Sequence, residues 1–315
     1  MSLNVSETLP AQDCWFLTGA TAVGKTSVAL ALAKKLGAEI ISMDSMAIYR
    51  GMDIGTAKPT PEEQGQVPHH LIDIVDPSDE YSVAQYVEQA HSLVLEIRSR
   101  GNEPLFVGGT PLYLKSLLRG IFDGPPADWK LREEIEKELE EVGSQALHQV
   151  LQQVDPLAAD AIHPNDARRL IRAIEVYRTT GQPISHQQMQ FDDGRPAEEC
   201  RVFVLRRPRE QQRERINERV DSMLERGLVE EVRGLVEKGV QFGRTSSQAV
   251  GYREVLAQLE GEITHEEMVE KIKSSTRRFS KRQGTWFRSL SECRFVDVEA
   301  DETPEENAGR IAEMP

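Results

Sequence analysis

The chain has 315 residues, of which 39% are hydrophobic, 6% aromatic and 29% charged, a balance typical of globular proteins and not of disordered ones. Its length allows a substantial core and more than one domain. The formal net charge of −14 argues, taken globally, against nucleic acid as a partner, because phosphate backbones attract basic surfaces. The charge is uneven, however, since residues 271–288 hold seven Lys or Arg and no acid.

The targeting features of the sequence indicate a cytoplasmic protein with no membrane partner. The first residues, MSLNVSETLPAQD, lack a basic stretch followed by an apolar run, so no signal peptide is indicated. No apolar run approaches the roughly 20 residues that span a bilayer. The three cysteines, Cys14, Cys200 and Cys293, have no metal-ligand spacing and are interpreted as reduced thiols.

The first hundred residues alternate short apolar runs with helical patterns. We expect strands at 14–18, 39–42 and 104–107, with helices at 25–36 and 84–100. Such alternation is typical of a parallel α/β sheet.

After Gly120 the pattern changes. A proline-rich link, 123–128, is followed by purely helical spacing to about Gly181, and a strand at 201–205 resumes the sheet. The predicted fold is therefore a P-loop-type parallel α/β sheet flanked by helices, with an inserted all-helical domain. The expected boundaries are 1–121 for the first part of the core, 122–198 for the insertion and 199–315 for the second part. Further helices are expected at 208–226, 228–238 and 264–288.

A phosphate-binding loop follows the first expected strand. GATAVGKT, residues 19–26, fits the pattern G-x-x-x-x-G-K-[ST] and opens a helix. Its glycines allow backbone N–H groups to face an anion, and the helix N-terminus adds partial positive charge. Lys25 supplies a full charge, and the Thr26 hydroxyl is placed to ligate Mg²⁺, the expected cofactor. The expected diphosphate-binding residues are Gly19, Ala20, Thr21, Ala22, Val23, Gly24, Lys25 and Thr26.

Two more loops follow expected strands and should line the same crevice, because the carboxyl ends of parallel strands lie at one edge. Asp44 follows the second strand, and Gly108-Gly109-Thr110 follows the third. On position alone Asp44 is equally well explained as a turn or capping residue, and Thr110 as the N-cap of the next helix. An ATP-using kinase often has a buried strand that ends in an acid. Here the apolar strand ends in Gly-Gly, and the segment 71–76 is a weak substitute for a strand that ends in an acid. This makes an ATP-dependent kinase a less favoured interpretation without excluding it.

Basic residues mark three expected helices. Arg219 lies on an amphipathic helix, and Arg168 and Arg172 share one face of the insertion helix at i, i+4 spacing. In the helix at 264–288 the bases Lys273, Arg277 and Lys281 repeat every four residues, while the apolar residues Ile272, Phe279 and Trp286 recur every seven. A solvated surface explains each of these, but seven bases without an acid favour contact with a polyanion for the last helix.

Together these strings resemble the tRNA dimethylallyltransferases, also called tRNA isopentenyltransferases, of the bacterial type. The matching strings follow in family order: GATAVGKT (19–26), DSMAIYRGMDIGTAKPT (44–60), VGGTPLYLKSLLRG (107–120), HPNDARRLIRAIEVY (163–177), QAVGYRE (248–254) and KRQGTWFR (281–288). They span residues 15–290. Ala20 departs from the Pro that is common in the family, and Val23 is a second mild departure.

The resemblance implies transfer of a dimethylallyl group from dimethylallyl diphosphate to N6 of the adenosine 3′ of the anticodon, position 37, with release of diphosphate. It implies that Asp44 is the general base, that Arg219 neutralises the leaving group and that Thr110 positions the base. The implied partners are tRNA, through its anticodon stem-loop, and dimethylallyl diphosphate, and we expect a monomer.

The resemblance also implies residues that contact tRNA. They are Asp44, Ser45, Met46, Ala47, Thr110, Arg132, Arg168, Arg169, Leu170, Ile171, Arg172, Gln248, Ala249, Val250, Gly251, Tyr252, Arg253, Lys281, Arg282, Gln283, Gly284, Thr285, Trp286, Phe287 and Arg288. The spacing of Trp286 from Phe279 favours core packing over base stacking. The alternatives from the phosphate loop alone are an ATP-dependent small-molecule kinase and a non-enzymatic nucleotide-gated RNA-binding protein.

Overall fold

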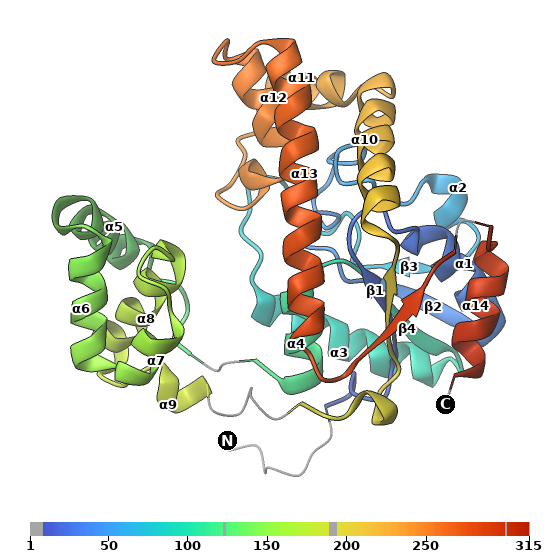
Figure 1. Ribbon diagram of the computed structural model, residues 1–315, viewed down its shortest axis with the longest axis horizontal. Coiled ribbons are helices and arrows are strands. Elements are labelled where there is room, and N and C mark those ends of the chain that lie inside the picture. Colours follow the sequence, from blue (N-terminus) through green and yellow to red (C-terminus); the bar gives the residue numbers. More distant parts are fainter. Residues whose placement is uncertain (1–8, 122–123, 189–193, 300, 315) are drawn as a thin grey trace. The chain divides into compact units, whose positions relative to one another are not determined.

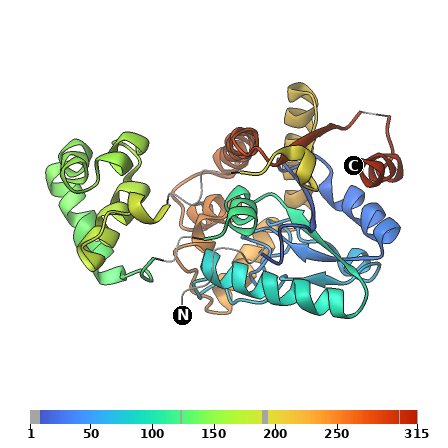
Figure 2. The same ribbon diagram turned by 90° about the horizontal axis from the view of Figure 1, so that it is seen from below.

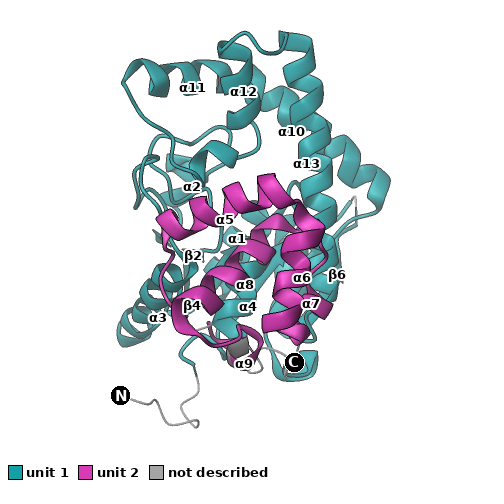
Figure 3. Cartoon of the chain, turned by 90° about the vertical axis from the view of Figure 1, so that its left-hand side faces the viewer, with its two compact units in different colours: residues 1–118, 194–315 teal, residues 119–193 magenta. Residues whose placement is uncertain are grey.

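The computed structural model describes residues 9–121, 124–188, 194–299 and 301–314 (Figure 1). The chain divides into two compact units, residues 1–118 with 194–315, and residues 119–193 (Figure 3). The sequence predicted an insertion at 122–198. Residue 122, where the predicted insertion begins, and residue 123, where the predicted link begins, lie outside the described residues. So do residues 1–8, on which the signal-peptide prediction rests in part.

The larger unit holds a six-stranded sheet in the order β3-β2-β4-β1-β5-β6, in which every pairing is parallel. The strands are β1 (Trp15–Gly19), β2 (Ala38–Ser42), β3 (His69–His70), β4 (Glu103–Gly108), β5 (Val202–Arg206) and β6 (Cys293–Asp297). The predicted parallel α/β fold is confirmed, and the four predicted strands agree within one residue at each end.

Two edge strands were missed, and one weak strand candidate was wrong. β3 has two residues and β6 carries Arg294 and Asp297, so neither has the apolar run of a central strand. In the segment 71–76 only Val75 pairs, in an isolated bridge with Tyr49. Leu71 and Asp73 have positive φ angles of 58° and 56°, which no strand tolerates.

Helices surround this sheet. They are α1 (Lys25–Leu36), α2 (Pro61–Gln64), α3 (Val83–Ser99), α4 (Pro111–Arg119), α10 (Arg209–Glu225), α11 (Leu228–Glu237), α12 (Tyr252–Leu259), α13 (His265–Arg288) and α14 (Pro304–Glu313), with 3₁₀ turns η2 (Ala197–Glu199) and η3 (Ser246–Gln248). The Thr264 side chain accepts a hydrogen bond from the Glu267 N–H and begins α13, as predicted. α12 and α14 were not predicted.

One face of the sheet packs under α1 and α14, which lie side by side (Figures 1 and 2). Its core includes Leu17, Leu32, Phe203 and Ile311, all essentially inaccessible to solvent. A second core joins the loop after β2 to α10, α11, α12 and α13. The sheet and these helices together fix the loops at its carboxyl edge.

The smaller unit is all-helical in its described residues. It contains α5 (Trp129–Val142), α6 (Ser144–Val154), α7 (Pro156–Ala161), α8 (Ala167–Thr180) and α9 (Ser185–Gln188). Its own core is built on Ile135, Leu147, Leu151, Leu170 and Ile174. The Asp166 carboxylate caps α8 by accepting from the Arg169 N–H.

The buried face of α13 differs from the predicted one. The predicted apolar row was Ile272, Phe279 and Trp286, but Phe279 is 37% exposed and Phe287 is fully buried. A fixed seven-residue period fails because a straight α-helix drifts about 20° per heptad. The partners of α13 also change along its length, from α10 and α12 to β1.

Candidate functional site

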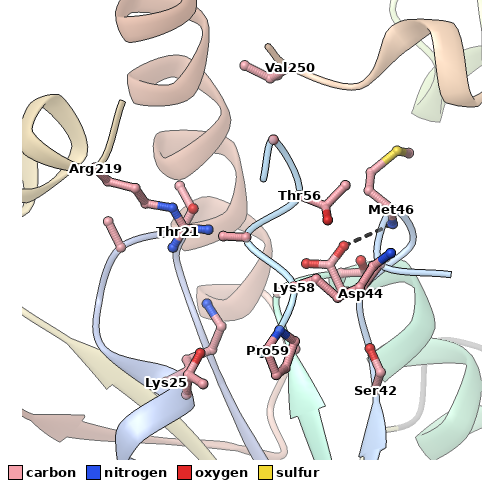
Figure 4. Close-up of a pocket in the computed structure, with 18 of the residues that line it drawn as sticks. Thr21, Lys25, Ser42, Asp44, Met46, Thr56, Lys58, Pro59, Arg219 and Val250 are labelled. Atoms are coloured by element: carbon pink, nitrogen blue, oxygen red, sulfur yellow. Dashed lines mark hydrogen bonds between the residues drawn. The ribbon is translucent and has the colours of Figure 1, made fainter. Parts of the chain in front are cut away.

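The carboxyl ends of β1, β2 and β4 bring three loops to one pocket. These strands are neighbours in the order β2-β4-β1, so the phosphate loop, Asp44 and the Gly108–Thr110 loop meet at the same edge. The pocket has a volume of about 640 Å³ and lies wholly in the larger unit. Figure 4 shows Lys25, Asp44 and Arg219 bordering one space.

The phosphate loop is held from outside by side chains of the segment after β5. The Arg215 Nε donates to the Ala22 carbonyl (2.9 Å), and the Arg207 Nε donates to the Val23 carbonyl (3.0 Å). The Lys25 Nζ donates to the carbonyls of Gly19 (2.9 Å) and Ala20 (3.0 Å). With these carbonyls satisfied, the loop keeps one conformation, and the N-terminus of α1 faces the pocket with its positive partial charge.

Positive charge exceeds negative charge around the pocket. Burial and, as a smaller cause, the nearby Arg219 lower the pKa of Lys25 to about 8, while Asp44 opposes the shift. Burial also lowers the pKa of Arg219, while Asp44 opposes this and Arg215 adds to it. The lining residues include two carboxylates, on Asp44 and Glu63, against a larger set of bases. Such an arrangement favours binding of an anion.

Asp44 keeps one carboxylate oxygen for chemistry. The Met46 N–H donates to its Oδ1 (2.9 Å), and its other oxygen has no hydrogen bond among the described residues (Figure 4). The Thr110 Oγ1 accepts from the Ser45 N–H (3.0 Å). Thr110 therefore holds the loop that carries Asp44, and this role replaces the alternative in which its side chain caps α4.

The two glycines after β4 permit close approach of these loops. A Cβ atom on Gly108 would lie 2.1 Å from the Met43 carbonyl oxygen, and one on Gly109 would lie 2.6 Å from the Gln283 Nε2. Real Cβ atoms essentially never come so close. Gly108, whose Cβ would meet backbone atoms, is thus needed for packing, which explains why no acid ends β4, whereas the Gly109 contact is with the end of a side chain.

A fourth wall, residues 55–59, is anchored by side chains that sequence reasoning missed. The Glu231 carboxylate accepts the N–H groups of Asp53 (3.1 Å), Ile54 (2.8 Å) and Gly55 (3.4 Å), and also the Tyr252 hydroxyl. In the sequence Glu231 is one of many acids on a surface-like helix, so no pattern distinguishes it.

Lys58 anchors the same wall from within. Its buried ammonium pairs with Asp53 (2.5 Å) and Asp73 (2.6 Å) and donates to the Tyr49 carbonyl (2.9 Å). Lys58 lies in the string at residues 44–60 that carries part of the family resemblance, and this was the available indication of its importance.

Several predicted tRNA contacts do line this pocket. They are Asp44, Ser45, Met46, Ala47, Thr110, Gln248, Ala249, Val250, Gly251, Arg282 and Gln283. Four other predicted contacts have buried side chains: Tyr252 and Phe287 in the larger unit, and Leu170 and Ile171 in the smaller. Contact of these four residues with tRNA stays a prediction. They share motifs with the exposed bases, but helical geometry turns them to the opposite face.

The predicted row of bases on α13 is also divided. Lys273 pairs with Asp221 of α10 (2.6 Å), and Arg277 donates to the Asn217 Oδ1 (2.8 Å). Lys281, Arg282 and Arg288 are exposed. The exposed member of the predicted row is therefore Lys281, in the C-terminal half of α13.

In the insertion, two of the arginines predicted to contact tRNA already form ion pairs within the protein. Arg132 (2.9 Å) and Arg172 (2.6 Å) both bind the fully buried carboxylate of Glu175. Burial opposes ionisation of this carboxylate, but its hydrogen bonds outweigh burial and lower the pKa of Glu175. Arg168 and Arg169 are exposed on α8, the helix that carries Arg172.

Comparison with known proteins gives a consistent family. The family model described as IPP transferase matches residues 47–290. A protein of Rhodopirellula baltica named tRNA dimethylallyltransferase is 48% identical over 302 residues, which cover 93% of this chain and 90% of that protein.

Solved structures agree. The tRNA isopentenylpyrophosphate transferase of Bacillus halodurans is 42% identical, with a TM-score of 0.68, over 96% of both chains. A eukaryotic dimethylallyltransferase acting on tRNA is 28% identical, with a TM-score of 0.75, over 96% of this chain and 77% of that one.

No helix among the described residues is long and apolar enough to cross a membrane. The identity, the coverage and the shared fold leave one conclusion: this chain belongs to the IPP transferase family, the tRNA dimethylallyltransferases.

Proposed function

We propose that this protein transfers a dimethylallyl group from dimethylallyl diphosphate to N6 of adenosine 37 in tRNA, the adenosine 3′ of the anticodon. The supporting observation is a single pocket in which the half-free carboxylate of Asp44 lies beside an anion-binding loop. A base and an anion site together suit alkyl transfer with diphosphate as the leaving group.

In the proposed step the N6 nitrogen attacks the allylic C1 of the donor. The N6–C1 bond forms, the C1–O bond breaks, and the electron pair leaves with diphosphate. Asp44 takes the N6 proton, because the adenine amino group is a weak nucleophile that benefits from a positioned general base. Thr110 fixes the Asp44 loop through the Ser45 N–H.

Positive groups around the loop would bind the diphosphate. Lys25 and Arg219 carry the charges, and the N-terminus of α1 adds N–H donors. The donor set also fits Mg²⁺, since the Thr26 hydroxyl lines the pocket and has no hydrogen-bond partner among the described residues. Among the described residues no group of three or more His, Cys, Asp or Glu could hold a metal ion. We propose that the Thr26 hydroxyl and the substrate phosphates would hold the ion. When bound, Mg²⁺ would neutralise charge on the leaving diphosphate.

Apolar side chains form another part of the pocket and suit a dimethylallyl group. Met46, Met223, Val250 and Phe279 all line it. The Phe279 ring also lies under the Arg282 guanidinium, 5.9 Å from its centroid, so both would be available to an extruded base.

Exposed bases supply the proposed contacts to the anticodon stem-loop. They are Arg253, Lys281, Arg282 and Arg288 in the larger unit and Arg168 and Arg169 in the insertion. We further propose a cytoplasmic monomer, from the sequence features given above.

Incubation with anticodon stem-loop RNA and labelled dimethylallyl diphosphate, with an ATP control, tests the function. Label on the RNA adenosine is the expected result. ATP turnover on a small acceptor would instead support the kinase, and RNA binding without turnover the non-enzymatic alternative.

A further inference from the structure

Gln283 on α13 joins two loops of the pocket that are far apart in the sequence. Its Oε1 accepts the Thr21 N–H (2.9 Å) of the phosphate loop, and its Nε2 donates to the Gly109 carbonyl (2.6 Å) after β4. One partner is a donor and the other an acceptor, so the orientation of the amide is fixed. The side chain is 4% exposed, and both of its polar atoms are used.

The packing around Gly109 shows how closely this bridge fits. A Cβ on Gly109 would lie 2.6 Å from the Gln283 Nε2 and 3.6 Å from the Lys25 Nζ. The amide therefore lies where the loop carrying Lys25 meets the loop carrying Thr110. Through Thr110 and the Ser45 N–H the same contacts extend to the Asp44 loop.

Gln283 also lies next to exposed bases. Phe279 and Gln283 line the pocket at i, i+4 spacing, and the neighbouring Lys281 and Arg282 are exposed. One turn of α13 thus carries both the buried bridge and bases that we assign to RNA contact.

We propose that Gln283 is a positioning residue of the diphosphate site, and not a tRNA contact. The inference rests on the proposed function for the identity of the donor, but the bridge itself is testable with inorganic diphosphate. Without the amide, the Thr21 N–H and the Gly109 carbonyl lose their partners, and an unpaired buried group is costly. The loops then relax to other separations, which misplaces Lys25 relative to Asp44.

The test uses Gln283→Met, which keeps the length of the side chain but forms neither hydrogen bond. Ser280→Ala is the matched control, because Ser280 is buried on the same helix and its hydroxyl makes no hydrogen bond among the described residues. Three quantities are measured: the Kd for inorganic diphosphate with Mg²⁺, the Kd for an anticodon stem-loop, and the single-turnover transfer rate.

For Gln283→Met we expect roughly tenfold weaker diphosphate binding and at least a tenfold slower transfer, with stem-loop affinity within about twofold of wild type. Ser280→Ala should leave all three quantities unchanged. Gln283→Glu keeps an acceptor for Thr21 but sets a carboxylate against the Gly109 carbonyl and the anion site, so its diphosphate binding should weaken at least as much. If Gln283→Met does not fold, Gln283→Glu is compared with wild type instead.

Two results would overturn the inference. A higher Kd of Gln283→Met for the stem-loop, with an unchanged Kd for diphosphate, would show that Gln283 is an RNA contact. Unchanged values of all three quantities would leave it a packing residue. Failure of the proposed function is distinguishable, because wild-type protein would then show no transfer while the diphosphate measurement still reports on the bridge.

Discussion

Lys25 and Arg219 of the donor pocket differ from Arg132 and Arg172 of the helical insertion in whether an acid among the described residues forms an ion pair with them. Burial lowers the pKa values of both Lys25 and Arg219, and the nearby charge of Arg219 lowers that of Lys25 further. Arg132 and Arg172 instead converge on Glu175, and their hydrogen bonds hold the pKa of that carboxyl below its usual value. Partly buried cations without an ion-pair partner among the described residues favour binding of an external anion, whereas removal of one member of a buried ion pair destabilises the fold.

This difference separates two arginines that the sequence treats alike. Arg168 and Arg172 lie four residues apart on α8, yet Arg172 is tied to Glu175 and to the Pro125 carbonyl, while Arg168 is exposed. Glu175 lies three residues after Arg172 on α8, whereas its second partner, Arg132, comes from α5. Helical spacing can indicate the first of these pairs but not the second.

The largest effect on the transfer rate is expected for Asp44, the proposed general base, which lies near Lys25 and Arg219. Asp44→Asn should bind tRNA normally but lose about 10²–10⁴ in the single-turnover rate, since an amide cannot take the N6 proton. Met46 continues to donate to the amide oxygen, so the loop should keep its shape. A rate within a few-fold of wild type would return Asp44 to the role of a turn residue.

Removing the unpaired cation should weaken anion binding directly. Lys25→Met is expected to raise the Kd for inorganic diphosphate by roughly 10–100-fold, the usual span for a hydrogen bond to a charged group. Calorimetric titration measures it, and stem-loop affinity serves as the control. Equal diphosphate affinity in variant and wild type would rule out this loop as the donor site.

Removing a paired cation should instead cost stability. Arg172→Met leaves the buried Glu175 with fewer donors, and we expect a loss of roughly 1–3 kcal/mol in the insertion. Hydrogen exchange of α5 and α8 amides in the intact protein measures it, with Arg168→Met as the matched control. Comparable protection in the two variants would contradict the contrast drawn between these arginines.

The lowered pKa of Lys25 predicts a pH dependence. The free protein loses this charge as pH rises through about 8, so diphosphate affinity should fall by up to about tenfold between pH 7 and 9. The stability of the fold should change in the opposite direction. Between the pKa of Lys25 in the folded protein, about 8, and the higher pKa of the unfolded chain, the unfolded chain binds more protons, so the free energy of unfolding rises with pH. Lys25→Met corrects for the titration of diphosphate itself, and parallel pH profiles would refute the prediction.

The smallest effect concerns the exposed bases of α13. Changing Lys281 and Arg282 together to Gln should flatten the log–log salt dependence of stem-loop binding by roughly 1.4, at about 0.7 per phosphate contact on single strands. Lys273→Gln is the control, since Lys273 already pairs with Asp221. Equal slopes for the double variant and wild type would show that this face is only solvated.

Local pattern was sufficient for much of this protein. The central strands, the phosphate loop and the long helices have apolar periodicity, glycine stops and capping residues that local physical chemistry recognises. The strings around Asp44 and Thr110 pointed to the family that the comparisons show. The edge strands β3 and β6 lacked such patterns and were missed. The helices α12 and α14 were missed as well, although Thr303 and Glu306 form a capping box at the start of α14.

The sequence by itself determined the parallel α/β core, the position of the phosphate loop and the family. Only the tertiary structure decided which charged and polar groups are already used. Glu231 and Lys58 hold the wall at 55–59, Arg132 holds Glu175, and Gln283 bridges two loops. The physical reason is that each partner comes from a distant part of the chain, so no local spacing encodes the pair, whereas periodicity and capping act within a few residues.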